Sequence, residues 1–515
     1  MTAVADPIPP LRARPAPPLA RRRIESPVAA ALAVYGAALA WTVVVRLPLW
    51  RMDGLDDAFY VEVAHLWTRG VLPYVGAFDV KPPGFFAILA GAEALLGPSL
   101  DALRAVAVAF DALAAAAMFF LGRRFGGARL GLFAAILYPI LSELVTSNDA
   151  YCPLAALTIL AFLAALSPLG LMKRAALAGL FIGAAGAVKQ TAGFEAVALL
   201  FVVVGAPDGA GRRGRAALAF ALAASVAPLG FLLYFAWHGA AQALIDDALL
   251  GALGRPASAS EGLSFVDGVG RAFVLQKSVV AIFGLSVLAL IRRRALRSAL
   301  PLAPLGALEA WFALASLSIL AQRAIAITYL GPTLAPGLLL AGLCITKAAP
   351  ELDPIPAAMR LVALGLASLA TALAIPGNDL SARQESRALA AAAAAIRASG
   401  LTPGDALYVV NRGAWLYGAL EMAPPTRYFF PGHTLCDFQQ NGPGLLEEVL
   451  ATAPRYLVVA DRRLHYVCER KDRWRVVDAA LKRSYRRIAH AAGEVDSYDV
   501  YQAVGAAAPA PAPAP

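Results

Sequence analysis

The feature that most restricts this chain is a series of apolar runs, each close to the length of a membrane-spanning helix. An α-helix crosses the bilayer core in about 20 residues, and eleven such runs occur between residues 28 and 375. Hydrophobic residues make up 59% of the chain and charged residues only 16%, which excludes an ordinary soluble or disordered protein. The sequence therefore predicts a polytopic α-helical membrane protein. The expected spans are 28–47, 103–121, 130–146, 152–168, 175–188, 192–206, 216–237, 272–291, 299–320, 325–346 and 357–375.

The basic residues predict how these spans are oriented. Lys and Arg in short loops stay on the cytoplasmic side, and most of the basic clusters fall on one side if the N-terminus is cytoplasmic. The net charge of +10 is then explained by topology, without a nucleic-acid partner. This orientation requires that the apolar run 82–97, which is short for a span, lies at the outer interface. Residues 48–102 become a long first outer loop.

The remaining segments divide the chain into a membrane domain with appended regions. Residues 1–27 are rich in Pro, Ala and Arg and are expected to be a disordered cytoplasmic tail, while 28–375 form the membrane domain. Residues 376–503 predict a small extracytoplasmic α/β domain, followed by a disordered Ala/Pro tail at 504–515. Within the outer domain we expect a helix at 383–399 and strands at 405–411, 426–430 and 455–460. Cys436 and Cys468 form either a disulfide or two separate thiols.

The first outer loop carries the residues with the clearest chemical potential. Asp56 and Asp57 follow the first span, and Lys81 precedes two prolines that restrict its backbone. A carboxylate can act as a general base on an acceptor, and a fixed ammonium can neutralise a leaving phosphate. The pair therefore favours displacement at a carbon that bears a phosphate. The plain alternative is a solvated loop or a helix N-cap.

Four motifs in and beside this loop carry a resemblance to a known family. They are D-[DE]-x-x-Y-x-E from Asp56, G-x-x-P-Y from Gly70, D-x-K-P-P-G from Asp79 and G-x-S-x-x-A-L-R from Gly97. The chain thereby resembles the C-type (GT-C) membrane glycosyltransferases. Within them it is similar to the bacterial relatives of the protein O-mannosyltransferases, a group with the lipid A aminoarabinose transferase and the rhizobial galacturonosyltransferases.

The resemblance implies a reaction and a location. It implies a GT-C fold whose enzyme moves a sugar from a polyprenyl-phosphate donor by a single inverting displacement. The acceptor would be lipid A or lipopolysaccharide, a polysaccharide or a protein hydroxyl, on the periplasmic face of a bacterial inner membrane. Nucleic acid is not expected as a partner. Adjacent carboxylates can bind a divalent metal, but relatives with phosphate-contacting lysines need none, so no obligatory cofactor is expected.

The resemblance also assigns roles by position. Asp56 matches the family's catalytic acidic residue, and Asp57, the second catalytic candidate, stands where many relatives have Glu. The resemblance assigns Lys81 to contact with the donor phosphate. The predicted outer positions of Lys189 and Arg323 make them two further candidates for contact with that phosphate. Lys189 has snorkelling as an equal alternative. The supporting pocket residues are Tyr60, Glu62, Tyr74 and Asp149.

Two other classes compete with a transferase. A polytopic transporter or lipid-sugar flippase would share the hydropathy, and a non-catalytic subunit of an envelope complex would share the outer domain. Transporters usually show paired repeats, and we find none in this sequence. The intramembrane acids Asp111, Glu195 and Glu309 are candidates for function by default, but the sequence names no partner for them.

Overall fold

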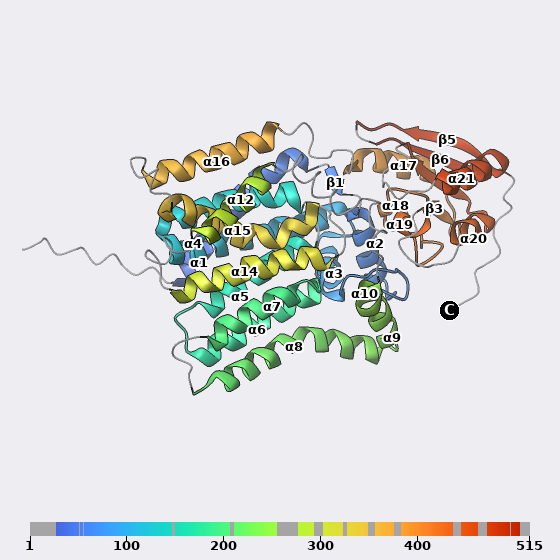
Figure 1. The fold of residues 1–515 in the computed structure, drawn as a ribbon. Helices are drawn as coiled ribbons and strands as arrows, with labels where there is room; N and C mark the ends of the chain where they lie inside the picture. The colour runs from blue at the N-terminus through green and yellow to red at the C-terminus, as the bar shows by residue number, and fades with distance from the viewer. Residues whose placement is uncertain are drawn as a thin grey trace, which may run out of the picture.

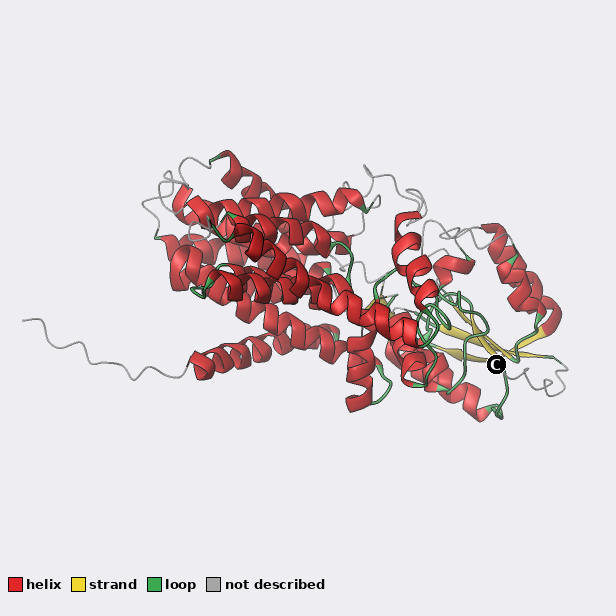
Figure 2. Ribbon diagram, turned by 90° about the horizontal axis from the view of Figure 1, so that it is seen from below, coloured by secondary structure: helices red, strands yellow, loops and turns green. Residues whose placement is uncertain are grey.

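The structure is a computed structural model of a helical bundle that carries a small mixed domain at one end. It describes residues 27–504 except 51, 55, 147–149, 206–210, 255–276, 293–301, 323–326, 349–355, 375–382, 436–443, 462–470 and 495. The long helices run side by side in one part of the molecule, and the strands gather at the opposite end (Figures 1 and 2). Helices α2 and α3 lie between the two parts (Figure 1).

Within the part of the chain that the structure describes, each expected apolar run overlaps one or more helical elements. Within the described residues, six helices are long and apolar enough to cross a membrane, as the fold prediction requires. Others are shorter, so the number eleven stays a prediction. The helices of the bundle are α1 (Pro27–Arg46), α4 (Leu100–Val145), α5 (Tyr151–Ala165), α6 (Leu171–Val188), α7 (Ala192–Val204), α8 (Arg213–Trp237), α12 (Lys277–Ile291), α14 (Leu302–Ala321), α15 (Gly331–Leu343) and α16 (Ala357–Ala374). Short helical turns η4 (Ile327–Leu330) and η5 (Cys344–Ala348) flank α15.

Helix α4 contains two of the expected spans because its chain reverses at a glycine pair. Gly126 and Gly127 have non-helical dihedrals, and Gly127 has a φ of 81°, which an L side chain rarely adopts. The two halves then pack closely, since a Cβ on Gly122 would lie 2.6 Å from the Cα of Gly131. Glycine at these positions therefore permits a tight helical hairpin.

Two intramembrane acids find partners inside the bundle. The indole Nε1 of Trp311 donates to Glu195 at 3.0 Å, and Asp111 pairs with Arg46 at 2.5 Å. The structure thus supplies the partners that the sequence could not name for these two acids. Arg46 ends the first span, far from Asp111 in sequence, so hydropathy alone does not reveal the pair.

The first outer loop folds into short helices that rest on the bundle. Helix α2 (Asp57–Thr68) follows a short 3-10 turn, η1 (Leu47–Leu49), and strand β1 (Met52–Gly54). Helix α3 (Pro83–Leu96) has 14 residues, too few for a bilayer span. Beyond α8 the chain forms α9 (Ala241–Leu244), the π-helix η3 (Ile245–Gly251) and α10 (Ala252–Gly254), beside α2 and α3 (Figure 1).

The outer domain is built on a four-stranded sheet. Its strands are β3 (Leu407–Val409), β4 (Tyr456–Ala460), β5 (Tyr485–Ala491) and β6 (Tyr498–Ala503), in the order β3-β4-β6-β5. Strands β3 and β4 are parallel, and the other two pairs are antiparallel. The associated helices are α17 (Ser386–Ala398), α18 (Trp415–Ala419), α19 (Pro431–Thr434), α20 (Leu445–Ala451) and α21 (Lys471–Ser484).

The structure agrees with some of the elements expected from the sequence in this domain and not with others. The helix at 383–399 and the strands at 405–411 and 455–460 correspond to α17, β3 and β4. The strand expected at 426–430 is wrong, because this segment is a turn whose rings Phe429 and Phe430 pack on Phe59 of α2, with centroids 4.9 and 5.1 Å away. Strands β5 and β6 were not expected.

A second, two-stranded sheet joins the outer domain to the first loop. Strand β1 pairs antiparallel with β2 (Arg383–Glu385), so Met52 faces Glu385 and Gly54 faces Arg383 in register. Strand β2 leads directly into α17. The segment just before α2 is therefore hydrogen-bonded to the segment that begins the outer domain.

Candidate active site

Asp56 and Tyr60 meet at the start of α2. Asp56 precedes the first residue of the helix, and the Tyr60 hydroxyl donates to Asp56 Oδ2 at 2.8 Å. Their separation of four residues places both side chains on one face of the helix. Asp57, in the first turn, is buried with 3% of its surface exposed. The structure thus leaves Asp56, and not Asp57, as the more accessible carboxylate of the pair.

Lys81 lies over the aromatic ring of Tyr60. Its Nζ is 4.4 Å from the centroid of that ring, within the range of a cation–π contact. Asp79 contacts Lys81 at two atoms. Asp79 Oδ1 accepts a hydrogen bond from the Lys81 main-chain N–H at 2.8 Å, and Asp79 Oδ2 lies 3.7 Å from Lys81 Nζ. Tyr60 therefore contacts Asp56 through its hydroxyl and Lys81 through its ring, which brings the predicted acid and ammonium around one aromatic side chain.

Lys189 occupies a second aromatic site at the end of α6. It is the extended residue that terminates the helix, and 8% of its surface is exposed. Its Nζ lies 4.3 Å from the Tyr151 ring centroid and 5.8 Å from that of Tyr329. The Tyr151 hydroxyl donates to Gln322 Oε1 at 3.1 Å. The ammonium is thus held among aromatic rings.

The backbone beside Lys81 touches the backbone beside Lys189. A Cβ on Gly84 would lie 2.5 Å from the carbonyl oxygen of Ala187, so only glycine permits this approach of α3 to the end of α6. Gln190 then donates through Nε2 to the carbonyl of Val80 at 2.6 Å and to that of Ala248 at 2.7 Å. The two lysines therefore extend from adjoining segments. Gln190 was missed by sequence reasoning, although it directly follows Lys189.

An arginine of the outer domain fastens the loop that carries Lys81. Arg427 Nη1 donates to the main-chain oxygen of Tyr74 at 2.5 Å and to Asp247 Oδ2 of η3 at 3.0 Å. The Tyr74 hydroxyl donates in turn to the carbonyl of Lys81 at 2.6 Å. Burial raises the pKa of Asp247, and the adjacent Arg427 guanidinium opposes that rise. Arg427 and Asp247 are long-range partners, and no local sequence signal pairs them.

Tyr74 has an unusual backbone conformation within this loop. Its φ is 69°, a left-handed value that costs a non-glycine residue free energy. The side chain is fully buried, and its main-chain N–H donates to the carbonyl of Ala77 at 2.8 Å. Tyr74 therefore holds the Lys81 carbonyl from inside the fold.

Glu62 lies on a different face of α2, toward the outer domain. A Cβ on Gly418 of α18 would meet Glu62 Oε2 at 3.0 Å, and the residue has 1% of its surface exposed. Burial raises the pKa of Glu62 well above its ordinary value, and Glu93 of α3 adds to the rise. Burial also raises the pKa of Glu93 to about 8, and Glu93 lies 3.6 Å from the ring of His65. Glu62 therefore belongs to an interface between α2, α3 and α18.

Two predicted site residues, Asp149 and Arg323, lie outside the described residues, as do Cys436 and Cys468. Gln322, which bonds to Tyr151, immediately precedes Arg323. Among the residues that are described, no three His, Cys, Asp or Glu side chains are grouped to hold a metal ion.

Known proteins share the fold that carries these residues. A family model described as dolichyl-phosphate-mannose-protein mannosyltransferase matches residues 80–237. The crystal structure of ArnT from Cupriavidus metallidurans bound to undecaprenyl phosphate superposes with a TM-score of 0.57 at 14% identity, covering 92% of this chain and 97% of that one. The chain has the GT-C glycosyltransferase fold. No match to a curated protein sequence is found.

A more distant enzyme shares the GT-C fold over most of this chain. The archaeal oligosaccharyltransferase AglB from Archaeoglobus fulgidus, in complex with an inhibitory peptide and a dolichol-phosphate, aligns with a TM-score of 0.51 at 14% identity. The alignment covers 83% of this chain and 69% of that chain. Together with the family model, these similarities confirm the predicted resemblance, fold class and enzyme class, a membrane glycosyltransferase.

Proposed function

We propose that this protein transfers a sugar from a polyprenyl-phosphate donor to an envelope acceptor on the periplasmic face of a bacterial inner membrane. The observation that carries the proposal is the arrangement of Asp56 and Lys81 around Tyr60. Two proteins of the same fold support the donor class, since the structure of ArnT has undecaprenyl phosphate bound and that of AglB is a complex with a dolichol-phosphate. The acceptor is lipid A or lipopolysaccharide, a polysaccharide or a protein hydroxyl.

The proposed reaction is one displacement at the anomeric carbon. The acceptor oxygen forms a bond to that carbon while its proton passes to Asp56, which acts as general base. The bond between the anomeric carbon and the phosphate oxygen breaks, and the polyprenyl phosphate leaves with the electron pair. Attack from the face opposite the phosphate inverts the configuration. The Tyr60 hydroxyl keeps the Asp56 carboxylate oriented.

The two lysines stabilise the leaving phosphate in this proposal. Lys81 and Lys189 each present an ammonium already held against an aromatic ring, so little reorganisation accompanies the build-up of negative charge. Arg323 is proposed as a third cationic contact. Because these residues supply positive charge without a divalent ion, the proposal needs no obligatory metal, and transfer is expected to persist in EDTA.

The other predicted residues have supporting roles. Tyr74 holds the Lys81 carbonyl, and Asp57 and Asp149 are proposed to shape the acceptor side of the site. Glu62 is proposed to act through the contact of α2 with the outer domain, since it faces Gly418. These roles predict that changes at Glu62 alter stability more than the chemical step.

The test is transfer by washed membranes that contain Asp56→Asn or Lys81→Ala. Loss of a general base typically lowers the rate by about 10²–10⁴-fold, and loss of one charge-stabilising donor by about 10²–10³-fold. Asp461→Asn and Lys482→Ala are the matched controls, because both residues lie on the exposed surface of the outer domain. Product formation at the control rate in both site variants would refute the proposal. Mass spectrometry of the product then identifies the sugar and its acceptor.

A further inference from the structure

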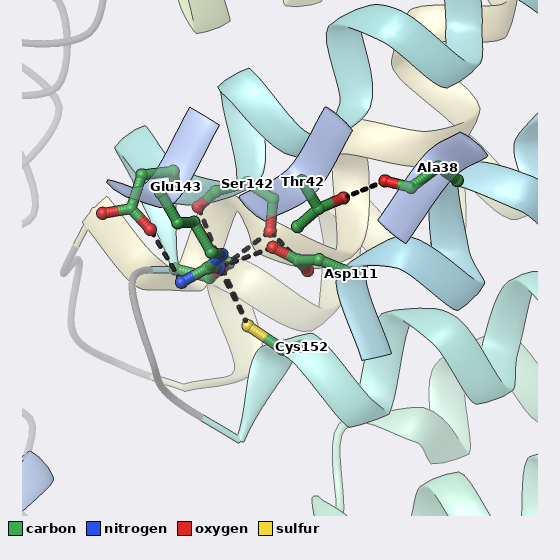
Figure 3. A network of polar contacts seen from close by, with 8 residues as sticks. Ala38, Thr42, Asp111, Ser142, Glu143 and Cys152 are labelled. Atoms are coloured by element: carbon green, nitrogen blue, oxygen red, sulfur yellow. Dashed lines mark hydrogen bonds and ion pairs between the residues drawn. The ribbon is translucent and has the colours of Figure 1, made fainter. Parts of the chain in front are cut away.

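A cluster of buried polar residues joins the ends of three helices beside the proposed donor site. We call it the Arg46 cluster: Arg46 of α1, Asp111, Ser142 and Glu143 of α4, Thr146 just after α4, and Cys152 of α5. Arg46 contacts Asp111 Oδ2 at 2.5 Å and Glu143 Oε2 at 2.7 Å. Figure 3 shows the side chains of Asp111, of the adjacent Ser142 and Glu143, and of Cys152 gathered around one centre.

The hydrogen bonds of the cluster reach the first turn of α5. Arg46 Nη2 lies 3.6 Å from Cys152 Sγ, and Thr146 Oγ1 lies at the same distance from that sulfur. Ser142 Oγ donates to Asp111 Oδ1 at 2.9 Å and is 3.0 Å from Thr146 Oγ1. A continuous chain of contacts therefore runs from the end of α1 to the beginning of α5.

The aromatic ring that contacts Lys189 belongs to a residue that adjoins this cluster in the sequence. Tyr151, whose ring lies 4.3 Å from Lys189 Nζ, is the residue before Cys152. Gly331 lies close to both Thr146 and Tyr151. A Cβ added to this glycine would lie 3.0 Å from Thr146 Cγ2 and 3.1 Å from the Tyr151 ring. Thr146 of the cluster and the Tyr151 ring thus border the same residue at the start of α15.

Stability alone is a poor explanation for such a cluster. Moving ions out of water costs several kcal/mol each, and a well-packed apolar replacement of a buried ion pair is often at least as stable. Arg46, Asp111 and Glu143 have at most 5% of their surface exposed. An arginine fork with two carboxylates does, however, fix geometry, since its donors lie in one rigid plane.

We infer that the Arg46 cluster positions the Tyr151 ring, and through it the Lys189 ammonium, for the phosphate of the lipid donor. The inference rests on the proposed function. Arg46 is a positioning residue and does not touch the donor. Disturbing the cluster is expected to weaken binding of the donor phosphate and also to slow its departure, because Lys189 is proposed to stabilise the leaving charge.

The test uses a neutral triple variant, Arg46→Met/Asp111→Asn/Glu143→Gln, in the full-length protein purified in detergent. Arg46→Met alone leaves two acids without their guanidinium and risks misfolding, whereas the triple variant removes all three charges with little change in volume. Ser286→Ala is the control, because it removes an equally buried hydrogen bond, to the carbonyl of Gly337, away from Tyr151.

Two readouts separate this inference from the proposed function. In transfer assays, the triple variant is expected to raise the KM for the lipid donor at least tenfold and to lower kcat as well, and Arg46→Lys to give intermediate values. Independently of transfer, undecaprenyl phosphate is expected to raise the Tm of the wild type and of Ser286→Ala much more than that of the triple variant.

The outcomes are distinct. A folded triple variant with wild-type KM and a wild-type Tm response to undecaprenyl phosphate overturns the positioning role and leaves the proposed function intact. A wild type that responds to undecaprenyl phosphate but transfers no sugar refutes the proposed function, and the Tm comparison still decides the positioning role. A wild type with neither response overturns both.

Discussion

Substituting Gly84 by alanine tests whether the contact between α3 and α6 sets the position of Lys81. The new Cβ would lie 2.5 Å from the carbonyl oxygen of Ala187, and ordinary contact begins at 3.4 Å, so about 0.9 Å of separation is missing. The obstructing atoms belong to the backbone at the end of a helix, so no side-chain rotamer change can provide the missing separation. The start of α3 is expected to move away from Lys189 by about that distance.

The expected consequence is a loss of turnover with the fold retained. A misplacement of about 1 Å in a positioned group costs up to about 10²-fold in rate, and overpacking costs about 1–3 kcal/mol of stability. We therefore expect Gly84→Ala to lower the initial transfer rate by about 10- to 100-fold while the purified protein stays monodisperse. Rates are measured in washed membranes with saturating acceptor, normalised to the amount of folded protein.

A matched control lies on the same helix. A Cβ on Gly91 meets nothing within 4 Å, so Gly91→Ala is expected to retain the wild-type rate and to stabilise α3 slightly. If Gly84→Ala transfers sugar within twofold of Gly91→Ala, the Pro-Pro-Gly sequence does not position the lysine, and the geometric argument for the paired lysines fails.

Two further predictions concern the contacts of the outer domain. Arg427→Met removes the donors to Asp247 and to the Tyr74 carbonyl, so the free energy of unfolding should fall by about 1–3 kcal/mol and transfer should fall with it. Thermal unfolding checks this against Arg487→Gln, which breaks an exposed ion pair worth about 0–1 kcal/mol; equal losses would contradict a special role for Arg427. For pH, folded Glu93 keeps its proton up to a pKa of about 8 whereas the unfolded chain releases it near 4.5, so stability falls as pH rises between these values, by at most about 1.4 kcal/mol per unit. His65, whose pKa is lowered by burial from 6.5, opposes this trend only below pH 6.5, so Tm is compared between pH 6.5 and 8. Glu93→Gln should reduce the slope there, although Glu62, whose pKa burial also raises, contributes in the same direction. An unchanged slope would show that Glu93 does not titrate in this range.

The sequence predicts best those features that depend on local composition. An apolar run must become a helix in a bilayer, because no other backbone arrangement of one segment satisfies its own hydrogen bonds there. The polar position at the end of a run likewise places Lys189 where α6 stops. The motif from Asp56 to Tyr60 gives a helix face directly, since residues four apart meet on one side.

Features that depend on contacts between distant segments were not predictable. Arg427 and Asp247 are 180 residues apart, and neither lies in a pattern that names the other. The segment 426–430 has the aromatic content of a strand, but packing on Phe59 wins over that local preference. Strand β5 is an edge strand with two adjacent arginines, Arg486 and Arg487, so it lacks the apolar pattern that marks β4.

The pairing of β1 with β2 has a consequence for biosynthesis. The tripeptide that leads into Asp56 is completed by residues 383–385, which leave the ribosome only after the last helix of the bundle. A nascent chain therefore completes the helices of the bundle before the segment that leads into Asp56 finds its partner strand. Chains that end before residue 385 are accordingly expected to lack the proposed transferase activity.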